Sequence, residues 1–333
     1  MKKTSLVRRV LALALAAAAI APAVHAQGAA DWPQHSVTIV MTFPPGSGVD
    51  VVGRLIQDPL ARVLGQPVII DYKVGAAGNI ASDYVAHAKP DGYTVLFGTA
   101  ATHGVNAALY RKLPFDVEAD FVPVAPINDV SNVLTINPNV INVNTLKEFV
   151  DEVRAHPGKY YYASTGNGTG THMAFAEMNA KLGLKMEHVP YKGGPEAIQA
   201  VLKGETCCIM NQVQTVLPQA KAGKVRLLAV TTARRVPAVA DVPTIAESGL
   251  PGTQGFDSST WFALFAPKGT DPAVVARLNA AVRQVLQEPD VKNRLESMGN
   301  TIRLETPEQF KATVHANRLK WADVVKATGV SID

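Results

Sequence analysis

Cysteine is nearly absent from this chain, which contains only Cys207 and Cys208, side by side. A disulfide between neighbouring cysteines strains the peptide bond that joins them, so a covalent bridge is disfavoured. One cysteine cluster without spaced histidine partners also argues against the common zinc sites. We therefore expect two small apolar residues in a buried strand, with no metal ion and no other cofactor.

Catalytic signatures are also missing. The sequence has no Gly-x-Ser-x-Gly nucleophile elbow, no P-loop lysine and no His-Glu-x-x-His zinc motif. The run Gly166-x-Gly168-x-Gly170 matches part of a dinucleotide fingerprint but lacks its final G-x-x-G spacing. Ser47 has no identifiable His/Asp partner, so an exported hydrolase is an unsupported alternative. We expect a protein that is not an enzyme.

Net charge is low once the N-terminal segment is set aside. The full chain has 32 Lys+Arg and 28 Asp+Glu, a formal charge of +4. The first 26 residues contain four of those basic residues and no acidic one, so the remainder is neutral with 28 of each. A nucleic-acid partner is not expected, and any bound anion must be held by local dipoles.

The N-terminal segment has the pattern of a cleaved export signal. Its positive residues precede an apolar run over 10–20, and small residues at 24–26 predict cleavage after Ala26. A membrane anchor is the alternative, but the run is shorter than the roughly 20 residues that span a bilayer and Pro22 interrupts it. We expect residues 1–26 to be a signal peptide.

Three loops rich in small residues follow predicted strands, at 43–50, 75–79 and 163–172. A helix N-terminus offers unpaired N–H groups and the positive end of the helix dipole, so it attracts anions without a charged side chain. Loops of this kind facing one another across a cleft favour the capture of a small anion. For the loop at 75–79 a structural turn is the preferred interpretation, because glycine often only permits positive φ.

Short apolar runs alternate with helical patterns, which indicates an α/β fold with largely parallel sheets. The 307 residues after the signal exceed one ordinary core, so two lobes are expected. Strands are predicted at 36–42, 67–70, 94–98, 132–136, 160–163, 185–190, 206–210 and 225–231. Helices are predicted at 49–63, 80–88, 145–153, 171–182 and 195–202, with two more beginning at Asp271-Pro272 and Thr306-Pro307.

Seven segments, in order, resemble one family. They are VTIVMTFPPGSGVDVVGR, VGAAGNIAS, YASTGNGTGTHMAFAEM, VPYKGG, AGKVRLLAVTTARR, VPTIAESGLPG and WFALFAPKGTDP. The chain is thereby similar to the periplasmic solute-binding receptors of the tripartite tricarboxylate transporter type, the Bug family. This resemblance implies a two-lobed, type II Venus-flytrap periplasmic-binding-protein fold whose second lobe is inserted in the first. We expect lobe 1 at 27–128 and 251–333, and lobe 2 at 129–250.

The same resemblance implies a function and a site. A monomeric periplasmic receptor would capture a small organic carboxylate, a di- or tricarboxylate with an aliphatic or aromatic body, and deliver it to transporter subunits in the membrane. The alternative is a sensor that signals to a membrane partner. The implied ligand-binding residues are Phe43, Ser47, Gly48, Thr99 and Ala100 in lobe 1, and Ser164, Thr165, Thr169, Thr171 and Asn211 in lobe 2.

Departures from the family pattern refine the ligand. Ser47 stands where the family commonly has glycine, and Cys207 and Asn211 stand where it often has aspartate. An aspartate would suit a ligand ammonium, whereas an asparagine can donate to a carboxylate without adding negative charge. The prediction therefore moves from amino acids toward mono- or dicarboxylates without an amino group.

Several nearby side chains have structural interpretations. We expect Asp50 to organise the first loop and His172 to cap or pack, while His103 either lines the cleft or lies in an exposed loop. Phe43 is either core or a ring at the cleft mouth. Trp261 and Phe262 begin a predicted strand and are expected in the core or at the hinge.

Overall fold

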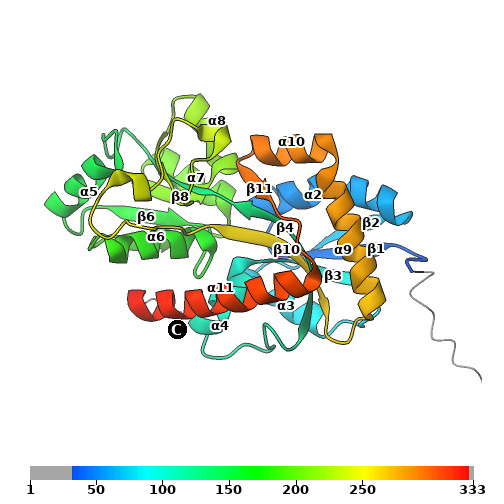
Figure 1. Ribbon diagram of the computed structural model, residues 1–333. Helices are drawn as coiled ribbons and strands as arrows, with labels where there is room; N and C mark the ends of the chain where they lie inside the picture. Colours follow the sequence, from blue (N-terminus) through cyan, green and yellow to red (C-terminus); the bar gives the residue numbers. More distant parts are fainter. Residues whose placement is uncertain (1–31, 330–333) are drawn as a thin grey trace, which may run out of the picture. The chain divides into compact units, whose positions relative to one another are not determined.

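The computed structural model describes residues 32–329 (Figure 1). The predicted signal peptide and its cleavage after Ala26 lie outside the described residues. Within them, no helix has both the length and the apolar character needed to cross a bilayer. The residues from Pro33 onward cluster as one unit, which contains two β-sheets.

The first lobe is built on a six-stranded sheet in the order β11-β4-β10-β3-β1-β2. The strands β1, β2 and β3 are parallel, whereas β10 runs antiparallel to β3 and β4, and β11 antiparallel to β4. The sheet is therefore mixed rather than largely parallel. Its strands are β1 (Val37–Met41), β2 (Val68–Tyr72), β3 (Thr94–Thr99), β4 (Phe121–Val130), β10 (Thr260–Pro267) and β11 (Asn300–Ile302).

The second lobe is built on a five-stranded sheet in the order β7-β6-β8-β5-β9. The central strand pair β5 and β8 is antiparallel, as is β5 with β9, while β6 is parallel to β7 and β8. The strands are β5 (Asn132–Ile136), β6 (Tyr161–Ser164), β7 (Glu187–Pro190), β8 (Cys208–Gln212) and β9 (Arg226–Val230). They lie between β4 and β10 in sequence, so lobe 2 is an insertion in lobe 1.

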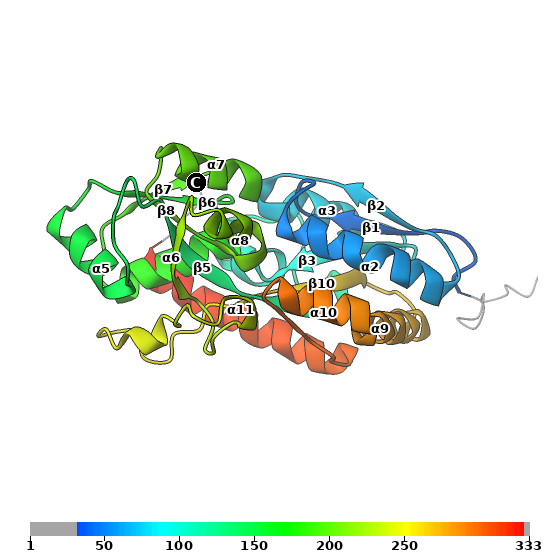
Figure 2. The same cartoon turned by 90° about the horizontal axis from the view of Figure 1, so that it is seen from above.

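Helices cover both faces of each sheet (Figures 1 and 2). Two groups of helices cover lobe 1. One group comprises α2 (Gly48–Leu64), α9 (Pro272–Gln287) and α10 (Pro289–Ser297). The other lies in the lower part of Figure 1 and comprises α3 (Asn79–Ala86), α4 (Asn106–Leu109) and α11 (Pro307–Thr328). Lobe 2 has α5 (Leu146–Ala155), α6 (Gly170–Lys181), α7 (Gly194–Lys203) and α8 (Val213–Lys221). Buried residues of α5 and α6 pack with one face of the second sheet, and those of α7 and α8 with the other.

Two strands connect the lobes directly. β4 ends at Val130 and β5 begins at Asn132, so only Ser131 separates a strand of one sheet from a strand of the other. The return connection enters β10 after Ser258, whose N–H donates to Thr231 at the end of lobe 2. Such short crossings suit a hinge, because few backbone dihedrals need to change when two lobes rotate.

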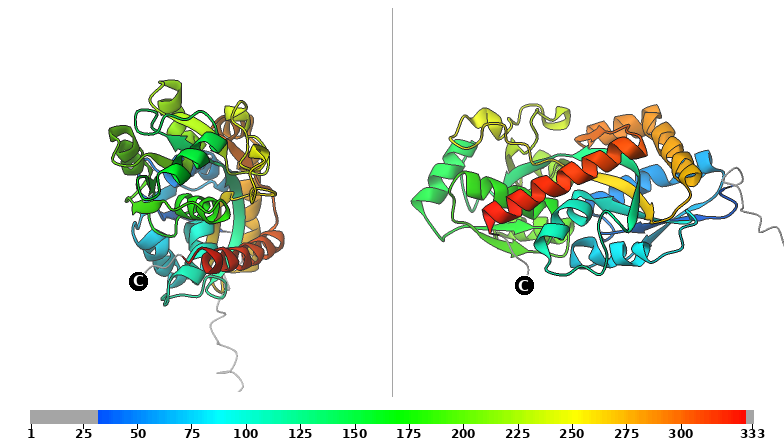
Figure 3. Two further views of the ribbon diagram at one scale, coloured as in Figure 1. Left: turned by 90° about the vertical axis from the view of Figure 1, so that its left-hand side faces the viewer. Right: turned by 60° about the horizontal axis from the view of Figure 1, so that its bottom comes forward.

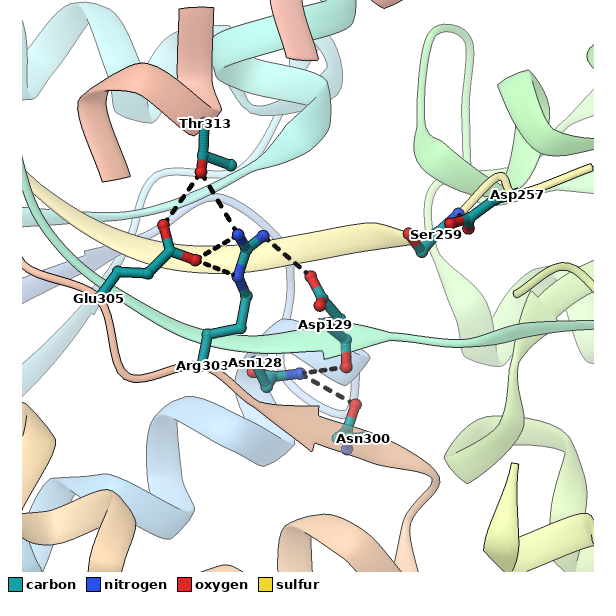
Figure 4. Close-up of polar contacts among 8 residues, drawn as sticks. All are labelled: Asn128, Asp129, Asp257, Ser259, Asn300, Arg303, Glu305 and Thr313. Carbon is teal, nitrogen blue, oxygen red and sulfur yellow. Dashed lines mark hydrogen bonds and ion pairs between the residues drawn. The ribbon is translucent and has the colours of Figure 1, made fainter. Parts of the chain in front are cut away.

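A polar cluster lies on the crossing strands (Figure 4). The Arg303 guanidinium bonds Asp129 Oδ1 at 3.1 Å and donates from Nε to Glu305 Oε1 at 2.7 Å. On the other side of β4, Asn128 Nδ2 donates to Asn300 Oδ1 at 3.0 Å. These bonds tie the end of β4 to β11 and to the segment that leads into α11.

The C-terminal helix reaches both lobes. In Figure 3, α11 extends from the first sheet along the second lobe, and it contacts α6. Its buried Trp321 packs with Val105 and Leu109 of lobe 1 and with Met173 of lobe 2. The helix therefore adds a further link between the lobes, made by apolar packing rather than by the chain itself.

Candidate functional site

A narrow cavity of about 40 Å³ lies between the two sheets. A space of this size accommodates about one to three water molecules. Both lobes contribute residues to its wall. The lining comprises Phe43, Ser47, Gly48, Val49, Thr99, Ala101, Thr260 and Phe262 with Asn132, Thr165, Thr169, Gly170, Thr171, Gly194, Asn211, Gln212 and Thr215.

Helix N-termini from both lobes meet at this cavity. The first residues of α2, α6 and α7, which are Gly48, Gly170 and Gly194, belong to its lining. The first N–H groups of a helix have no intrahelical acceptor, and the helix dipole places partial positive charge there. The wall therefore attracts an anion from three directions.

The caps of two of these helices are formed by lining residues. Ser47 Oγ accepts a bond from Asp50 N at 3.3 Å, and Thr169 Oγ1 accepts one from His172 N at 3.4 Å. Each cap satisfies one N–H of the first turn and fixes where the remaining N–H groups lie. The first residue of each of the three helices is a glycine, which adds no side chain of its own at the cavity wall.

No charged side chain belongs to the described lining of the cavity. Asp50 follows the lining residues 47–49 in sequence but is not part of the lining. Its carboxylate accepts bonds from Gly46 N at 2.7 Å, Arg54 Nε at 2.8 Å and Tyr72 OH at 2.5 Å. Burial alone would raise the pKa of Asp50, yet these bonds together lower it below its ordinary value. The prediction that Asp50 organises the first loop is confirmed.

A chain of hydroxyl groups shapes the loop that precedes α6. Thr165 N donates to Thr171 Oγ1 at 3.0 Å, and the hydroxyls of Thr165 and Thr171 lie 2.9 Å apart. Thr169 Oγ1 donates to Gly166 O at 2.8 Å and lies 3.0 Å from Thr171 Oγ1. Gly166, with φ of 128°, permits the turn. The three threonines are thereby held together at the cavity wall.

A buried serine and two stacked histidines support this loop from behind. Ser164 Oγ lies 2.6 Å from His188 Nε2 and accepts from Gly166 N at 3.1 Å. His172 Nδ1 accepts from Gly168 N at 3.0 Å, and the rings of His172 and His188 stack with centroids 3.8 Å apart. Burial lowers the pKa of His172 to about 4, and burial with the His172 charge lowers the pKa of His188 to about 3. His172 therefore packs and supports the loop, as predicted.

Two buried asparagines line the cavity near the crossing strands. Asn132, the first residue of β5, has no hydrogen-bond partner for either amide atom among the described residues. Asn211 Oδ1 accepts from Gln212 N at 2.8 Å, which leaves its Nδ2 without a partner there. Buried amide groups nearly always have partners, so unused donors and an unused acceptor in a cavity wall indicate places for a ligand.

Eight of the ten residues predicted for the site are brought together in this wall. They are Phe43, Ser47, Gly48, Thr99, Thr165, Thr169, Thr171 and Asn211. Ala100 and Ser164 lie outside the described lining: Ala101 occupies the wall beside Thr99, and the Ser164 hydroxyl is engaged with Gly166 and His188. The eight lining residues face the space between the lobes, whereas Ala100 and Ser164 do not.

Some lining residues were not predicted as ligand contacts. Asn132, Gln212 and Thr215 carry no recognisable motif, and Phe262 was expected in the core or at the hinge. The sequence feature that could have identified Asn132 as a lining residue is its position, because it is a polar residue at the start of a mostly apolar strand. The loop at 75–79 lies outside the described lining, in agreement with a structural turn.

His103 differs from both of its predicted positions. Its side chain is fully buried and stacks on Phe265, with ring centroids 3.7 Å apart. Burial lowers its pKa to about 3. The ring is part of the lobe 1 core because the chain after β3 turns at once into the helical turn Ala101–Val105 and carries it inward.

Two α/β lobes joined by crossing strands, with a cavity between them, define a two-lobed binding protein. The family model described as tripartite tricarboxylate transporter family receptor matches residues 52–330. The chain belongs to this family. BugT of Bordetella pertussis is 32% identical over 324 residues, which cover 97% of this chain and 97% of BugT.

Solved structures of similar proteins have the same two-lobed fold. The R. palustris protein Rpa4515 with adipate has a TM-score of 0.86 and 32% identity, over 90% of this chain and 99% of its own. MatC from Rhodopseudomonas palustris with bound malate has a TM-score of 0.82 and 35% identity, over 88% of this chain and 100% of its own. The predicted family and two-lobed fold are confirmed.

Proposed function

We propose that this protein is a periplasmic receptor that binds a small organic carboxylate between its lobes and delivers it to transporter subunits in the membrane. The observation that carries the proposal is the neutral cavity wall, in which helix N-termini of both lobes and unpartnered amide N–H groups converge. The bound adipate and malate of the two similar structures support the same ligand class.

The ligand stabilises the closed arrangement of the lobes in this proposal. A carboxylate accepts bonds from the N-termini of α2 in lobe 1 and of α6 and α7 in lobe 2, so it favours the state in which both lobes reach it. The contacts are proposed for Phe43, Ser47, Gly48, Thr99, Thr165, Thr169, Thr171 and Asn211. Ala100 and Ser164 take supporting positions behind them.

Cellular location and partners are parts of the same proposal. Export directed by the signal peptide, which is then cleaved after Ala26, would place the chain in the periplasm, where the transporter's membrane subunits can receive the ligand. The protein acts as a monomer without catalysis, because receptor function requires binding and release only. The proposal includes the two places where the chain passes between lobes, near residues 129 and 250.

A thermal-shift screen of residues 27–333 against mono-, di- and tricarboxylates tests the ligand class. A ligand present at about 100 times its dissociation constant adds about 2.7 kcal/mol to the free energy of unfolding when it binds only the folded state. Neutral sugars and primary amines serve as comparison ligands and should give no shift. Absence of a shift with every carboxylate would reject the proposed class.

An Asn211→Ala variant tests the site. Loss of one charge-assisted bond, worth about 1.5–3 kcal/mol, should weaken binding of the best carboxylate about 10- to 150-fold. Asn139→Ala, at an exposed position outside the cavity, is the matched control and should bind normally. Equal affinity for both variants would remove Asn211 from the site.

A further inference from the structure

Asn132 is buried where the chain crosses from one lobe to the other, and its side-chain amide makes no hydrogen bond to the described residues. Its backbone is used, since Thr231 N donates to Asn132 O at 2.9 Å and the residue pairs with Gln212 across the sheet. The side chain is fully buried, lines the cavity, and has no partner for Nδ2 or Oδ1 in the described structure. An amide desolvated without compensation destabilises the fold unless another group satisfies it.

The neighbouring strand β8 contributes a second amide to the cavity wall, that of Asn211. Asn211 Oδ1 accepts from Gln212 N, so the orientation of that amide is fixed and Nδ2 is its free group. Asn211 therefore presents a donor only. Asn132 presents both a donor and an acceptor, and rotation of its amide by 180° exchanges the two without changing this inventory.

A plain carboxylate cannot satisfy this set of groups. Its oxygens accept bonds from Asn132 Nδ2 and Asn211 Nδ2, but it has no hydrogen to donate to Asn132 Oδ1. A ligand ammonium could donate, yet the described cavity wall contains no acidic side chain to pair with its charge. A hydroxyl group is neutral and can donate and accept at once, so it fits the wall.

We propose that Asn132 is a specificity residue that recognises a hydroxyl group, and that the ligand is a hydroxycarboxylate. This inference rests on the proposed function, because the carboxylate of the same ligand is bound by the helix N-termini. A carboxylate without the hydroxyl leaves Asn132 Oδ1 unsatisfied when the lobes close, and therefore binds less tightly.

Isothermal titration calorimetry with matched ligands tests the inference. The pairs are malate and succinate, citrate and tricarballylate, lactate and propionate, and 3-hydroxyadipate and adipate, each titrated into the chain lacking residues 1–26. Within the pair that binds, the hydroxylated member should bind at least about tenfold more tightly. Equal binding of both members, or tighter binding of the member without the hydroxyl, would overturn the inference.

An Asn132→Leu variant assigns the preference to the residue. It keeps the side-chain size and removes both polar atoms, so the preference for the hydroxylated member should fall to about twofold or less, whatever the change in the affinity of either member alone. A preference that survives in this variant would also overturn the inference. The wild-type comparison decides alone if the variant does not fold.

Failure of the two proposals gives different results. If succinate and malate bind equally, carboxylate capture stands and only the hydroxyl preference is lost; a water molecule would then satisfy Asn132. If none of the eight compounds binds, the inference fails, and the proposed function falls with it only if the thermal-shift screen also finds no carboxylate, aromatic ones included. The titrations and the screen together separate the two claims.

Discussion

Gly48 shows how a single residue sets the approach of the lobes. A Cβ atom built on it would lie 1.6 Å from Gln212 Oε1 and 2.7 Å from Gln214 Nε2, both side chains of lobe 2. Gln214 Nε2 also donates to Gly48 O at 3.4 Å, and Asn300 Nδ2 donates to Gln214 Oε1 at 2.9 Å. The missing side chain is thus what lets glutamines of one lobe reach the helix start of the other.

A Gly48→Ala substitution should therefore weaken ligand binding. The ends of the two flexible glutamine side chains must turn away to admit the methyl group, which removes their contact with the start of α2, so we expect the dissociation constant of the best carboxylate to rise about 2- to 10-fold. The double variant Gly48→Ala with Gln212→Ala should recover much of this loss, because the clashing oxygen is removed. Unchanged affinity in the single variant, measured by calorimetry, would contradict this account of the contact.

The stacked histidines give lobe 2 a dependence on pH. Folding depresses the pKa of His188 to about 3 and of His172 to about 4, so the unfolded chain takes up protons at higher pH than the folded one. The stability is complete above about pH 6.5 and is lost as the pH falls below it, by about 1.4 kcal/mol per pH unit for each histidine.

A His188→Gln variant should show a smaller loss. Glutamine can still bond Ser164 but does not titrate, so the slope of unfolding free energy between about pH 6 and pH 4.5 should fall by about 1.4 kcal/mol per pH unit. Urea unfolding across that range measures it. His87→Gln, whose side chain is 69% exposed, is the control and should keep the wild-type slope. Equal slopes in His188→Gln and wild type would exclude His188 as the source.

At the scale of secondary-structure elements, helix starts could be predicted from local sequence. The helices α9 and α11 begin where expected, with Asp271 as the cap of α9 and Thr306 in a capping box with Gln309 at α11. At α5, Thr145 accepts from Glu148 N, but the Glu148 carboxylate accepts from Asn144 N and not from the N–H of the cap residue, so the reciprocal box does not form. Caps involve neighbours in sequence, which is why the pattern is informative.

β4 was not predicted, and its prolines are the reason. Proline lacks an N–H group and is normally excluded from central strands. Pro123 and Pro126 are accommodated because β4 pairs with β10 through two register shifts and because β11 covers only its last residues, Asn128–Val130. The chain tolerates these prolines through long-range pairing that no local pattern shows. The short elements α8, α10 and β11 were also missed.

The polar cluster on β4 makes a prediction at this scale. Arg303 is the partner of both Asp129 and Glu305. Burial, with the charges of Glu305 and Asp257, raises the pKa of Asp129 despite the opposing effect of Arg303. Loss of the arginine would therefore leave carboxylates close together without compensation.

An Arg303→Met variant should lose about 2 kcal/mol of unfolding free energy. This value lies between the losses expected when an exposed ion pair and a fully buried ion pair are broken. Arg62→Met, which breaks an exposed pair with Glu288, is the control and should cost less than about 0.5 kcal/mol. Urea unfolding measures both. Equal losses would show that the cluster contributes no more than a surface ion pair.

At the scale of the whole molecule, sequence motifs were sufficient for the family, the two lobes and the insertion of one in the other. They were sufficient for eight lining residues as well, because those residues lie at strand ends, in the loops that follow them or at helix starts. They were insufficient for Asn132 on β5, Gln212 at the end of β8 and Phe262 on β10, which reach the cavity through the packing of the two sheets against each other. The burial of His103 likewise depends on packing against Phe265 and Phe121.

The central claim is that neutral donors of two lobes hold a negatively charged carboxylate. Calorimetric titration of the tightest-binding carboxylate beside its isosteric primary amide tests it most directly. Hydrogen bonds to a charged acceptor are about twice as strong as neutral ones, so we predict that the carboxylate binds at least about 30-fold more tightly than the amide. Equal affinity for the two compounds would contradict the account.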